Sequence, residues 1–366
     1  MNLRDISILR FGNQQIAGSK FTSPREIAGW MGALQAQDFK MSKWAFGIRL
    51  KDSTETTINK AIDSGEIIRT HLLRPTWHFV SSKDIYWISE LTAAQIRASV
   101  KFRDIELGLT EAIFRKSNSV IEKSLRNGIH LTREELISNL VKANIDVADN
   151  RASHLLLRAE TNGIMCGGRL KNSKPTYTLL SEWVTKTKTL YRDEALKELS
   201  QRYFTSHGPA TLQDFTWWSG LSSNDSKLAL EFIKSDLLSE IIEKQTYWFV
   251  NSGNYPVNDP HKVFLLPAYD EFLISYRDRT ASLPFLNQKN AVSVNGIFYP
   301  TIVRNGQVIG TWKHINKKES VVLEMNLFDK TDPETEIDFS EASAQYANFI
   351  GKETEAIIPN FPNIRP

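Results

Sequence analysis

Leu34-Gln35-Ala36-Gln37-Asp38 follows directly on an expected helix. The residues Ser23-Pro24-Arg25-Glu26 have the form of a capping box, with proline at the first helical position. Apolar residues then recur at the spacing of one helical face, at Ile27, Trp30, Met31 and Leu34. In a continuing helix the side chains of Gln35 and Gln37 would point about 200° apart, whereas in an extended segment they would share a side. If both amides serve one centre, we expect the helix to end or loosen near Gln35.

The chain has 366 residues, enough for several compact units, and its composition is that of an ordinary globular protein. Its single cysteine, Cys166, excludes an internal disulfide framework and fits a reducing cytosol. The first residues contain no apolar signal region, and no uninterrupted run of about 18 apolar residues occurs. We expect a cytoplasmic protein that does not span a membrane.

The formal net charge of +3 is unevenly distributed along the chain. Residues 319–366 contain ten acidic residues and three Lys or Arg, so the preceding part of the chain is moderately basic. A basic body with an acidic tail is compatible with a polyanionic partner such as nucleic acid.

The first unit, residues 1–100, has the element order of a winged helix. Trp44 to Leu50 is expected to be a short strand or helix, and Thr54 to Ser64 a helix that ends at Gly65. Ile67 to Val80 is rich in β-branched and aromatic residues and predicts a hairpin, which Pro75 places at an edge or a bend. This hairpin carries a set of basic residues, namely Arg69, His71, Arg74 and His78.

The second unit, residues 101–185, repeats this order. Glu111 to Arg126 predicts one helix, a capping box at Thr132 opens a second, and a third ends at Gly163. The third helix carries a basic stripe at helical spacing, Arg151, His154 and Arg158. A hairpin with a turn at Asn172-Ser173 follows and adds Arg169, Lys171 and Lys174. A basic helix beside a basic hairpin suits phosphate contact, and a solvated positive face is the alternative.

The third unit, residues 186–250, again predicts three helices and a hairpin, with caps at Thr211 and at Ser222 or Ser223. The last unit, residues 251–366, predicts strands joined by turns at Asn295-Gly296 and Asn305-Gly306, and a closing helix at Glu341 to Ile350. The predicted fold is α+β and mostly α, with three tandem winged-helix units and a β-rich C-terminal α+β unit.

Several kinds of catalysis have no counterpart in the sequence. Its seven histidines are scattered without metal-ligand spacing, so we expect no metal and no cofactor. It contains no P-loop, no dinucleotide-binding glycine pattern and no Gly-x-Ser-x-Gly elbow. Cys166 is expected to be a small buried apolar residue.

An amide pair next to a basic hairpin remains. Glutamine cannot act as a general base at neutral pH, but it can hold a water by donating and accepting hydrogen bonds. Holding a water suffices when the leaving group departs readily, as a purine alkylated at N7 does, and positioning alone supplies several kcal/mol. Two surface glutamines at a helix end are the alternative.

Six stretches together resemble a known family over nearly the whole chain: Leu34-Gln35-Ala36-Gln37, Arg69-Thr70-His71-Leu72-Leu73-Arg74-Pro75-Thr76-Trp77-His78, Gly208-Pro209-Ala210-Thr211, Leu266-Pro267-Ala268-Tyr269-Asp270-Glu271, Tyr276-Arg277-Asp278-Arg279 and Gly310-Thr311-Trp312-Lys313. The chain resembles the winged-helix DNA-binding family that includes the AlkZ and YcaQ DNA glycosylases.

The resemblance implies a monofunctional glycosylase that releases N7-alkylated purines from double-stranded DNA, with interstrand crosslinks as a further substrate. Gln35-Ala36-Gln37 is similar to the AlkZ motif and makes Gln35 and Gln37 the candidate catalytic pair. Arg69, Thr76 and His78 match a second recurrent stretch and imply contacts to lesion or phosphate, and Arg277 and Arg279 imply further DNA contacts. The resemblance implies no obligate protein partner.

Other interpretations stay open from the sequence. The chain could be a non-catalytic DNA-binding protein, for instance a regulator, or its winged helices could serve protein contacts. Asp270 and Glu271 could supply a carboxylate base, or they could cap a helix or pair with Arg277 or Arg279. His78 could be a general acid or a hydrogen-bonded structural residue.

Overall fold

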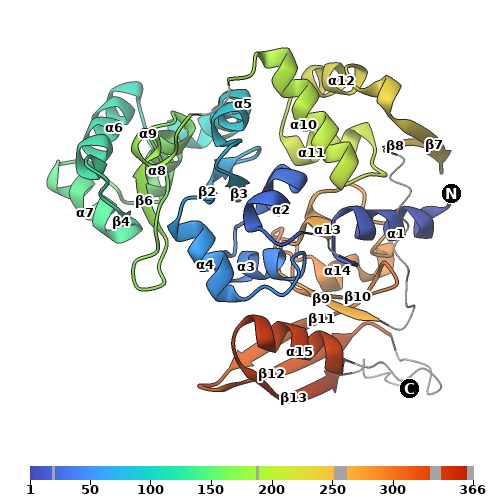
Figure 1. Cartoon of the computed structure of the whole chain (residues 1–366). Helices are drawn as coiled ribbons and strands as arrows, with labels where there is room; N and C mark the ends of the chain where they lie inside the picture. Colours follow the sequence, from blue (N-terminus) through green and yellow to red (C-terminus); the bar gives the residue numbers. More distant parts are fainter. Residues whose placement is uncertain (19–20, 187–188, 251–261, 330–338, 361–366) are drawn as a thin grey trace.

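The computed structural model describes residues 1–18, 21–186, 189–250, 262–329 and 339–360 (Figure 1). The first part forms helices around a small sheet: α1 (Leu3–Asn13), α2 (Pro24–Met31), β1 (Leu34–Gln35), α3 (Phe39–Gly47), α4 (Glu55–Asp63), β2 (Ile67–Leu72) and β3 (Thr76–Ser81). The sheet has the order β1-β3-β2 with antiparallel pairing throughout. The predicted hairpin and the helix capped by Thr54 are confirmed, and residues 44–47 are helical.

Helix α2 ends before the glutamine stretch, as expected. It stops at Met31, and Gly32 follows with a φ of 76°, a conformation that favours glycine. Leu34 and Gln35 are then extended, in β1. The capping box at the start of this helix is wrong, because the Ser23 side chain makes no capping hydrogen bond and the helix begins directly at Pro24.

A long helix, α5 (Ile85–Glu106), connects the first two parts and was not predicted. The second part contains α6 (Glu111–Leu125), β4 (Leu131–Thr132), α7 (Arg133–Lys142), α8 (Arg151–Thr161), β5 (Met165–Gly167), β6 (Thr176–Leu179) and α9 (Leu180–Trp183). Its strands form a sheet of order β4-β6-β5, and Thr132 forms the predicted capping box. This part has a hydrophobic core of its own, built from residues between Leu107 and Leu179.

The third part contains α10 (Arg192–Ser206), α11 (Leu212–Ser219), α12 (Ser223–Glu231), a short 3-10 helix η1 (Lys234–Asp236), and the hairpin of β7 (Leu238–Ile242) and β8 (Gln245–Phe249). Thr211 and Ser222 cap their helices as predicted. These helices share one core with α5 and with Ile68, Leu72 and Val80 of the first hairpin.

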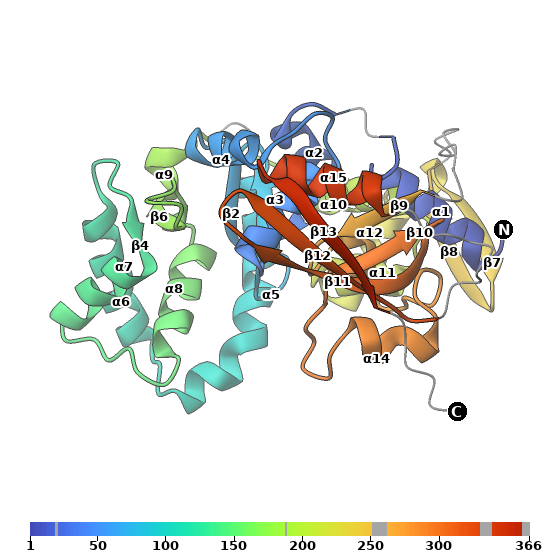
Figure 2. The ribbon, with the colours of Figure 1, turned by 90° about the horizontal axis from the view of Figure 1, so that it is seen from below.

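The last part is built on one five-stranded sheet of order β13-β12-β11-β10-β9, antiparallel except between β12 and β13 (Figure 2). Its elements are β9 (Val263–Leu266), α13 (Glu271–Ile274), η2 (Phe285–Asn287), α14 (Gln288–Ala291), β10 (Thr301–Arg304), β11 (Gln307–Asn316), β12 (Ser320–Leu327), α15 (Ser340–Phe349) and β13 (Glu353–Asn360).

The predicted turn at Asn305-Gly306 joins β10 to β11. A strand expected near Ala291 to Val294 is wrong, because residues 288–291 form α14 and only an isolated bridge, Val292 to Phe298, flanks Asn295-Gly296. The final strand, β13, was not predicted.

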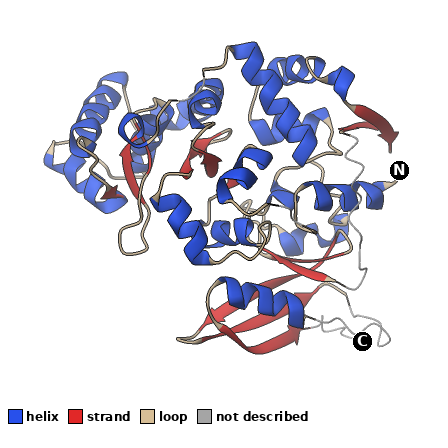
Figure 3. Ribbon diagram, in the orientation of Figure 1, coloured by secondary structure: helices blue, strands red, loops and turns tan. Residues whose placement is uncertain are grey.

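The large sheet packs directly onto the first part of the chain, and the two share one hydrophobic core. Trp44 Nε1 donates to the carbonyl of Leu265 at 2.6 Å, and one core continues from α2 and α3 into β9 to β12 and α15. Figure 3 shows the remaining strands as short hairpins among helices. The protein is thus a mixed α+β fold in which the glutamine stretch lies where three of these parts meet. None of the helices within the described ranges is long and apolar enough to cross a bilayer.

Candidate active site

Gln35 lies in β1 with only 4% of its surface exposed. β1 pairs with β3 and places Gln35 opposite His78. The side-chain Nε2 donates to Thr76 Oγ1 at 3.3 Å, and Oε1 accepts the N–H of Ala36 at 3.1 Å. The amide is therefore held to the first hairpin through Nε2 and to the neighbouring residue of its own segment through Oε1.

Gln37 is exposed, so the two amides do not share one environment as an extended segment would require. The physical reason is that β1 ends at Gln35. Asp38 then caps α3 by accepting the N–H groups of Lys40 and Met41, each at 3.0 Å, and the chain turns between the two glutamines. The protein fixes Gln35 and presents Gln37 to solvent.

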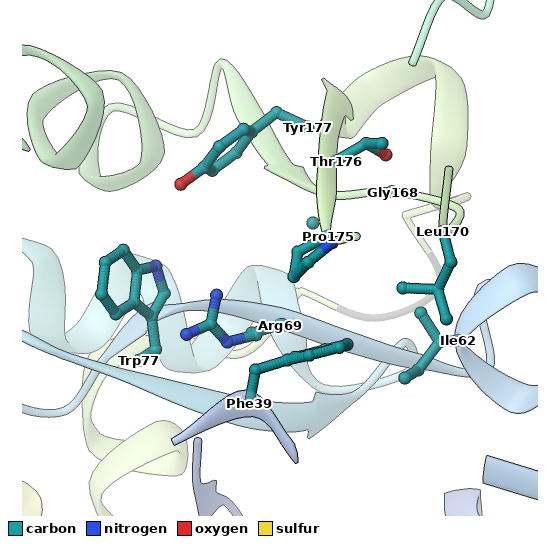
Figure 4. A pocket seen from close by; sticks show the side chains of 10 residues that line it. Phe39, Ile62, Arg69, Trp77, Gly168, Leu170, Pro175, Thr176 and Tyr177 are labelled. Atoms are coloured by element: carbon teal, nitrogen blue, oxygen red, sulfur yellow. The ribbon is translucent and has the colours of Figure 1, made fainter. Parts of the chain in front are cut away.

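The peptide between the two glutamines is held by the first hairpin. The Ala36 N–H donates to the carbonyl of Trp77 at 2.7 Å. The Ala36 carbonyl accepts two hydrogen bonds from Arg69, from Nε at 3.1 Å and from Nη2 at 2.9 Å. The Arg69 guanidinium also lies 4.4 Å from the ring of Trp77 and 5.5 Å from that of Phe39 (Figure 4). Burial lowers the pKa of Arg69, and its side chain supports the glutamine stretch from within.

A small hollow lies beside Arg69, between the two hairpins, lined by Phe39, Arg69, Trp77, Leu170, Pro175 and Tyr177 (Figure 4). Its volume of about 20 Å³ suffices for one water. A nucleobase is many times larger, so this hollow is not the place where a damaged base is held.

His71 and Thr70 connect the first hairpin to α8. His71 Nδ1 lies 2.5 Å from a carboxylate oxygen of Glu160, and the other oxygen accepts from the Thr70 hydroxyl at 3.2 Å. Both His71 and Glu160 are buried. This interaction fixes the two parts of the chain to each other, and only 8% of the His71 surface stays exposed.

His78 is fully buried behind Gln35. Burial, helped by the charge of Arg74, lowers the pKa of His78 to about 3, so the imidazole is neutral at physiological pH. Its Nδ1–H donates to the carbonyl of Thr76 at 3.0 Å, and within the described residues Nε2 has no partner. A neutral imidazole whose only N–H faces its own backbone cannot act as a general acid, which favours the structural role.

Asp270 and Glu271, which the sequence left open, have different partners. Asp270 caps α13 and accepts two hydrogen bonds from Arg49, each at 2.8 Å. Glu271 is 2% exposed and accepts the backbone N–H of Gln35 at 2.6 Å and the hydroxyl of Ser275. Asp270 thus caps a helix, as one of the sequence alternatives had it, and among the described residues neither acid pairs with Arg277 or Arg279.

Two arginines and an exposed tryptophan form a rim next to this site. The Trp217 ring lies 5.4 Å from the Arg74 guanidinium and 5.8 Å from that of Arg279, and Trp217 is 41% exposed. Its indole N–H donates to the carbonyl of Ile274 at 2.9 Å, which fixes the ring. Arg74 Nε and Nη2 are buried, and neither has a hydrogen-bond partner among the residues the structure describes. Burial and the charge of Arg74 lower the pKa of Arg279 to about 10.

Sequence reasoning missed Trp217. The observation that could have found it is the pair Trp217-Trp218, because neighbouring helical positions point about 100° apart and only one of them can face the core. Trp218 is fully buried.

The basic side chains of the α8 stripe interact with other residues of the protein. His154 Nδ1 lies 2.6 Å from Asp104, and Arg158 contacts Asp104 and Glu111 and covers the ring of Phe114 at 3.8 Å. Arg151 donates to the carbonyls of Asp146 and Leu107. The three side chains lie on one helical face, as their spacing predicted, but acids on α5 and α6 face them, and the geometry favours a structural role.

The second hairpin is different, since Arg169, Lys171 and Lys174 are all exposed around its turn. Lys171 pairs with the exposed Glu135 at 2.5 Å, and Arg169 Nε donates to the carbonyl of Asp63 at 3.2 Å. Arg277 is exposed near the rim as well. These side chains remain accessible to a phosphate backbone.

Known proteins resemble this chain in sequence and in fold. The chain is 22% identical over 341 residues to an interstrand DNA cross-link repair glycosylase of Streptomyces sahachiroi, covering 86% of this chain and 88% of that protein. The solved structure of the Streptomyces sahachiroi DNA glycosylase AlkZ is similar in fold, with a TM-score of 0.79 at 17% identity over 99% of this chain and 100% of the other. These similarities favour a repair glycosylase over a non-catalytic regulator. The family model of AlkZ-like DNA glycosylases matches residues 28–349, and the chain therefore belongs to the AlkZ-like DNA glycosylase family.

Proposed function

We propose that this glycosylase hydrolyses the N-glycosidic bond of N7-alkylated purines in double-stranded DNA, with interstrand crosslinks as a further substrate. Alkylation at N7 puts a positive charge on the purine. When the C1′–N9 bond breaks, its electron pair moves to N9 and the base leaves neutral. The sugar becomes oxocarbenium-like, a water oxygen bonds to C1′, and the water proton passes to solvent.

The observation that carries this proposal is the fixed Gln35 amide beside the exposed Gln37. Gln35 Nε2 has a second N–H besides the one directed to Thr76, and Gln37 offers a free donor and acceptor to solvent. The two amides can hold the attacking water between them once a nucleotide covers Gln37. Because the leaving group is good, orientation of that water is the main requirement.

DNA contact falls to the side chains that remain accessible. Arg277 is exposed near the rim, and Arg74 and Arg279 lie half-buried beside Trp217, where a guanidinium can bind phosphate and the indole can stack on a base. Arg169, Lys171 and Lys174 extend the contact along the second hairpin. The other predicted contacts, Arg69, His71, His78, Arg151, His154 and Arg158, hold these surfaces in place.

We further propose that the helices and hairpins form three winged-helix units followed by the β-rich unit. The elements α2 to β3, α6 to β6 and α10 to β8 each follow the order of helices and then a hairpin. The boundary between the first two units shifts from residue 100 to about residue 106, because α5 continues through Glu106.

The test is release of 7-methylguanine from methylated duplex DNA, followed by chromatography of the free base. The proposal predicts base release without strand cleavage, and unhooking of a duplex crosslinked through N7 of guanine. Tight binding to plain and methylated duplex with no free base would contradict it.

A further inference from the structure

The most unusual charge in the described structure is the carboxylate of Glu271. It is 2% exposed, yet no Lys or Arg among the described residues forms an ion pair with it. Its neighbour Asp270 is equally buried but has the guanidinium of Arg49 as partner. Burying an ionised carboxylate without a cation is unfavourable unless several hydrogen bonds replace the lost water.

Those hydrogen bonds come from β1 and from Ser275, the residue that follows α13. One oxygen of Glu271 accepts the backbone N–H of Gln35 at 2.6 Å. The other accepts the Ser275 hydroxyl and lies 3.7 Å from Nε2 of His207, at the end of α10. Burial acts to raise the pKa of Glu271, but the hydrogen bonds that its carboxylate accepts, among them the one from Ser275, lower the pKa below its ordinary value. The carboxylate is therefore ionised at neutral pH.

His207 is itself held in one orientation. Its ring stacks on Tyr203 at 4.9 Å, and its Nδ1 lies 2.8 Å from Ser206 Oγ. Burial lowers its pKa, so the ring is neutral. The Ser206 hydroxyl donates to the carbonyl of Arg202 at 2.7 Å, so its oxygen accepts the Nδ1–H of His207, and Nε2 of the neutral ring carries no proton. The hydrogen bonds of the Glu271 carboxylate therefore run to Ser275 and to the backbone of Gln35, and the His207 ring packs beside them.

The Glu271 carboxylate binds β1 along the edge that faces away from β3. β1 is two residues long and pairs with one strand, β3, along one edge. On the same side, the N–H of Ala36, the residue after β1, donates to the carbonyl of Trp77 in β3. The Gln35 N–H points the other way, and there the carboxylate of Glu271 occupies the place that an acceptor from a neighbouring strand would have. Among the described residues, Glu271 is the acceptor that holds the backbone N–H of Gln35 on that side.

We propose that Glu271 is a positioning residue of the glycosylase reaction, whose fixed carboxylate aligns Gln35 and places a permanent negative charge behind it. A strand of two residues is easily displaced, and a displacement of about 1 Å at a reacting group is enough to lower a rate substantially. A fixed negative charge also favours the positive charge that develops on the sugar. The proposal rests on the proposed role of Gln35.

The test compares Glu271→Gln with Asp104→Asn, measuring the single-turnover excision rate at saturating DNA, the DNA dissociation constant and the melting temperature. Asp104 is a matched control because it is a buried carboxylate with a histidine partner, His154 at 2.6 Å, in another part of the chain. We expect Glu271→Gln to lower the excision rate at least tenfold with affinity changed less than twofold. Asp104→Asn is expected to lower the melting temperature while the folded fraction keeps its rate.

Ser275→Ala keeps the charge of Glu271 but removes one of its hydrogen bonds, and it serves if Glu271→Gln does not fold. We expect it to lower the excision rate about threefold at unchanged affinity. Equal excision rates for the wild type, Ser275→Ala and any folded Glu271→Gln would overturn the proposal. If Gln35→Ala excises normally, the proposed site itself fails; if Gln35→Ala is inactive and Glu271→Gln is not, only the role of Glu271 fails.

Discussion

Arg69 donates two hydrogen bonds to the carbonyl of Ala36, the residue between the two site glutamines. The family resemblance of this stretch implied a contact from Arg69 to lesion or phosphate. The structure directs its guanidinium inward, between the rings of Phe39 and Trp77. Through these contacts, the Arg69 side chain holds the backbone of the glutamine stretch in place.

The variant Arg69→Lys tests this assignment. Lysine keeps the charge but cannot donate in the same plane from two nitrogens or stack in the same way. We expect the excision rate to fall about tenfold with little change in DNA affinity, because the glutamine stretch loosens. Weaker binding with a smaller salt dependence, at an unchanged rate, would instead identify Arg69 as a phosphate contact.

Trp217 is expected to stack on a base next to the lesion. Trp217→Ala should weaken DNA binding by roughly 1–3 kcal/mol, and Trp217→Phe by less, because the smaller ring still offers a stacking face. Phe102→Ala is a suitable control, since Phe102 is 74% exposed on α5. Equal affinities for Trp217→Ala and Phe102→Ala would contradict the stacking role.

The two sets of basic residues in the second part of the chain should respond differently to salt. Lys174 is exposed on the second hairpin, so Lys174→Ala should reduce the slope of log K against log salt by about 1. Arg158 is paired with Asp104 and Glu111, so Arg158→Ala should lower stability by on the order of 2 kcal/mol and leave the slope unchanged. Titrations at several salt concentrations and urea unfolding measure both. A slope reduced by Arg158→Ala would restore α8 as a DNA contact.

Stability should fall in mild acid because of His78. Its folded pKa is about 3, whereas an unfolded histidine titrates near 6.5. Below about pH 6.5 the unfolded chain therefore binds a proton that the folded chain refuses, and stability falls by about 1.4 kcal/mol per pH unit from this residue until the pH nears 3. The lowered pKa of His207 acts in the same direction. Urea unfolding of the wild type and His78→Gln between pH 7.5 and 4.5 should give a shallower dependence for the variant, and identical slopes would contradict this assignment.

Most helix caps and turns of this fold could be predicted from the sequence, because each depends on residues that are close together in the chain. The caps at Thr132, Thr211 and Ser222, and the Asn305-Gly306 turn, act within a few residues and are found where predicted. Ser23 shows the limit of such patterns, since the residue types of a capping box do not ensure its hydrogen bond.

The site itself was readable only in part. Gln35 and Gln37 could be singled out, but their separation into a buried and an exposed amide depends on a two-residue strand that pairs with residues 78 and 79. The bond from Gln35 to Glu271 spans 236 positions, and no periodicity in the sequence indicates it. The stripe on α8 was found by spacing, yet spacing cannot show that Asp104, on the unpredicted α5, would face it.

The most direct test of the central claim is single-turnover excision of 7-methylguanine by the wild type and by the double variant Gln35→Ala, Gln37→Ala, at DNA concentrations that saturate both. If the two amides hold the attacking water, the double variant should bind the methylated duplex as well as the wild type and release the base at least a hundredfold more slowly. Excision by the double variant at the rate of the wild type would contradict the assignment of the site.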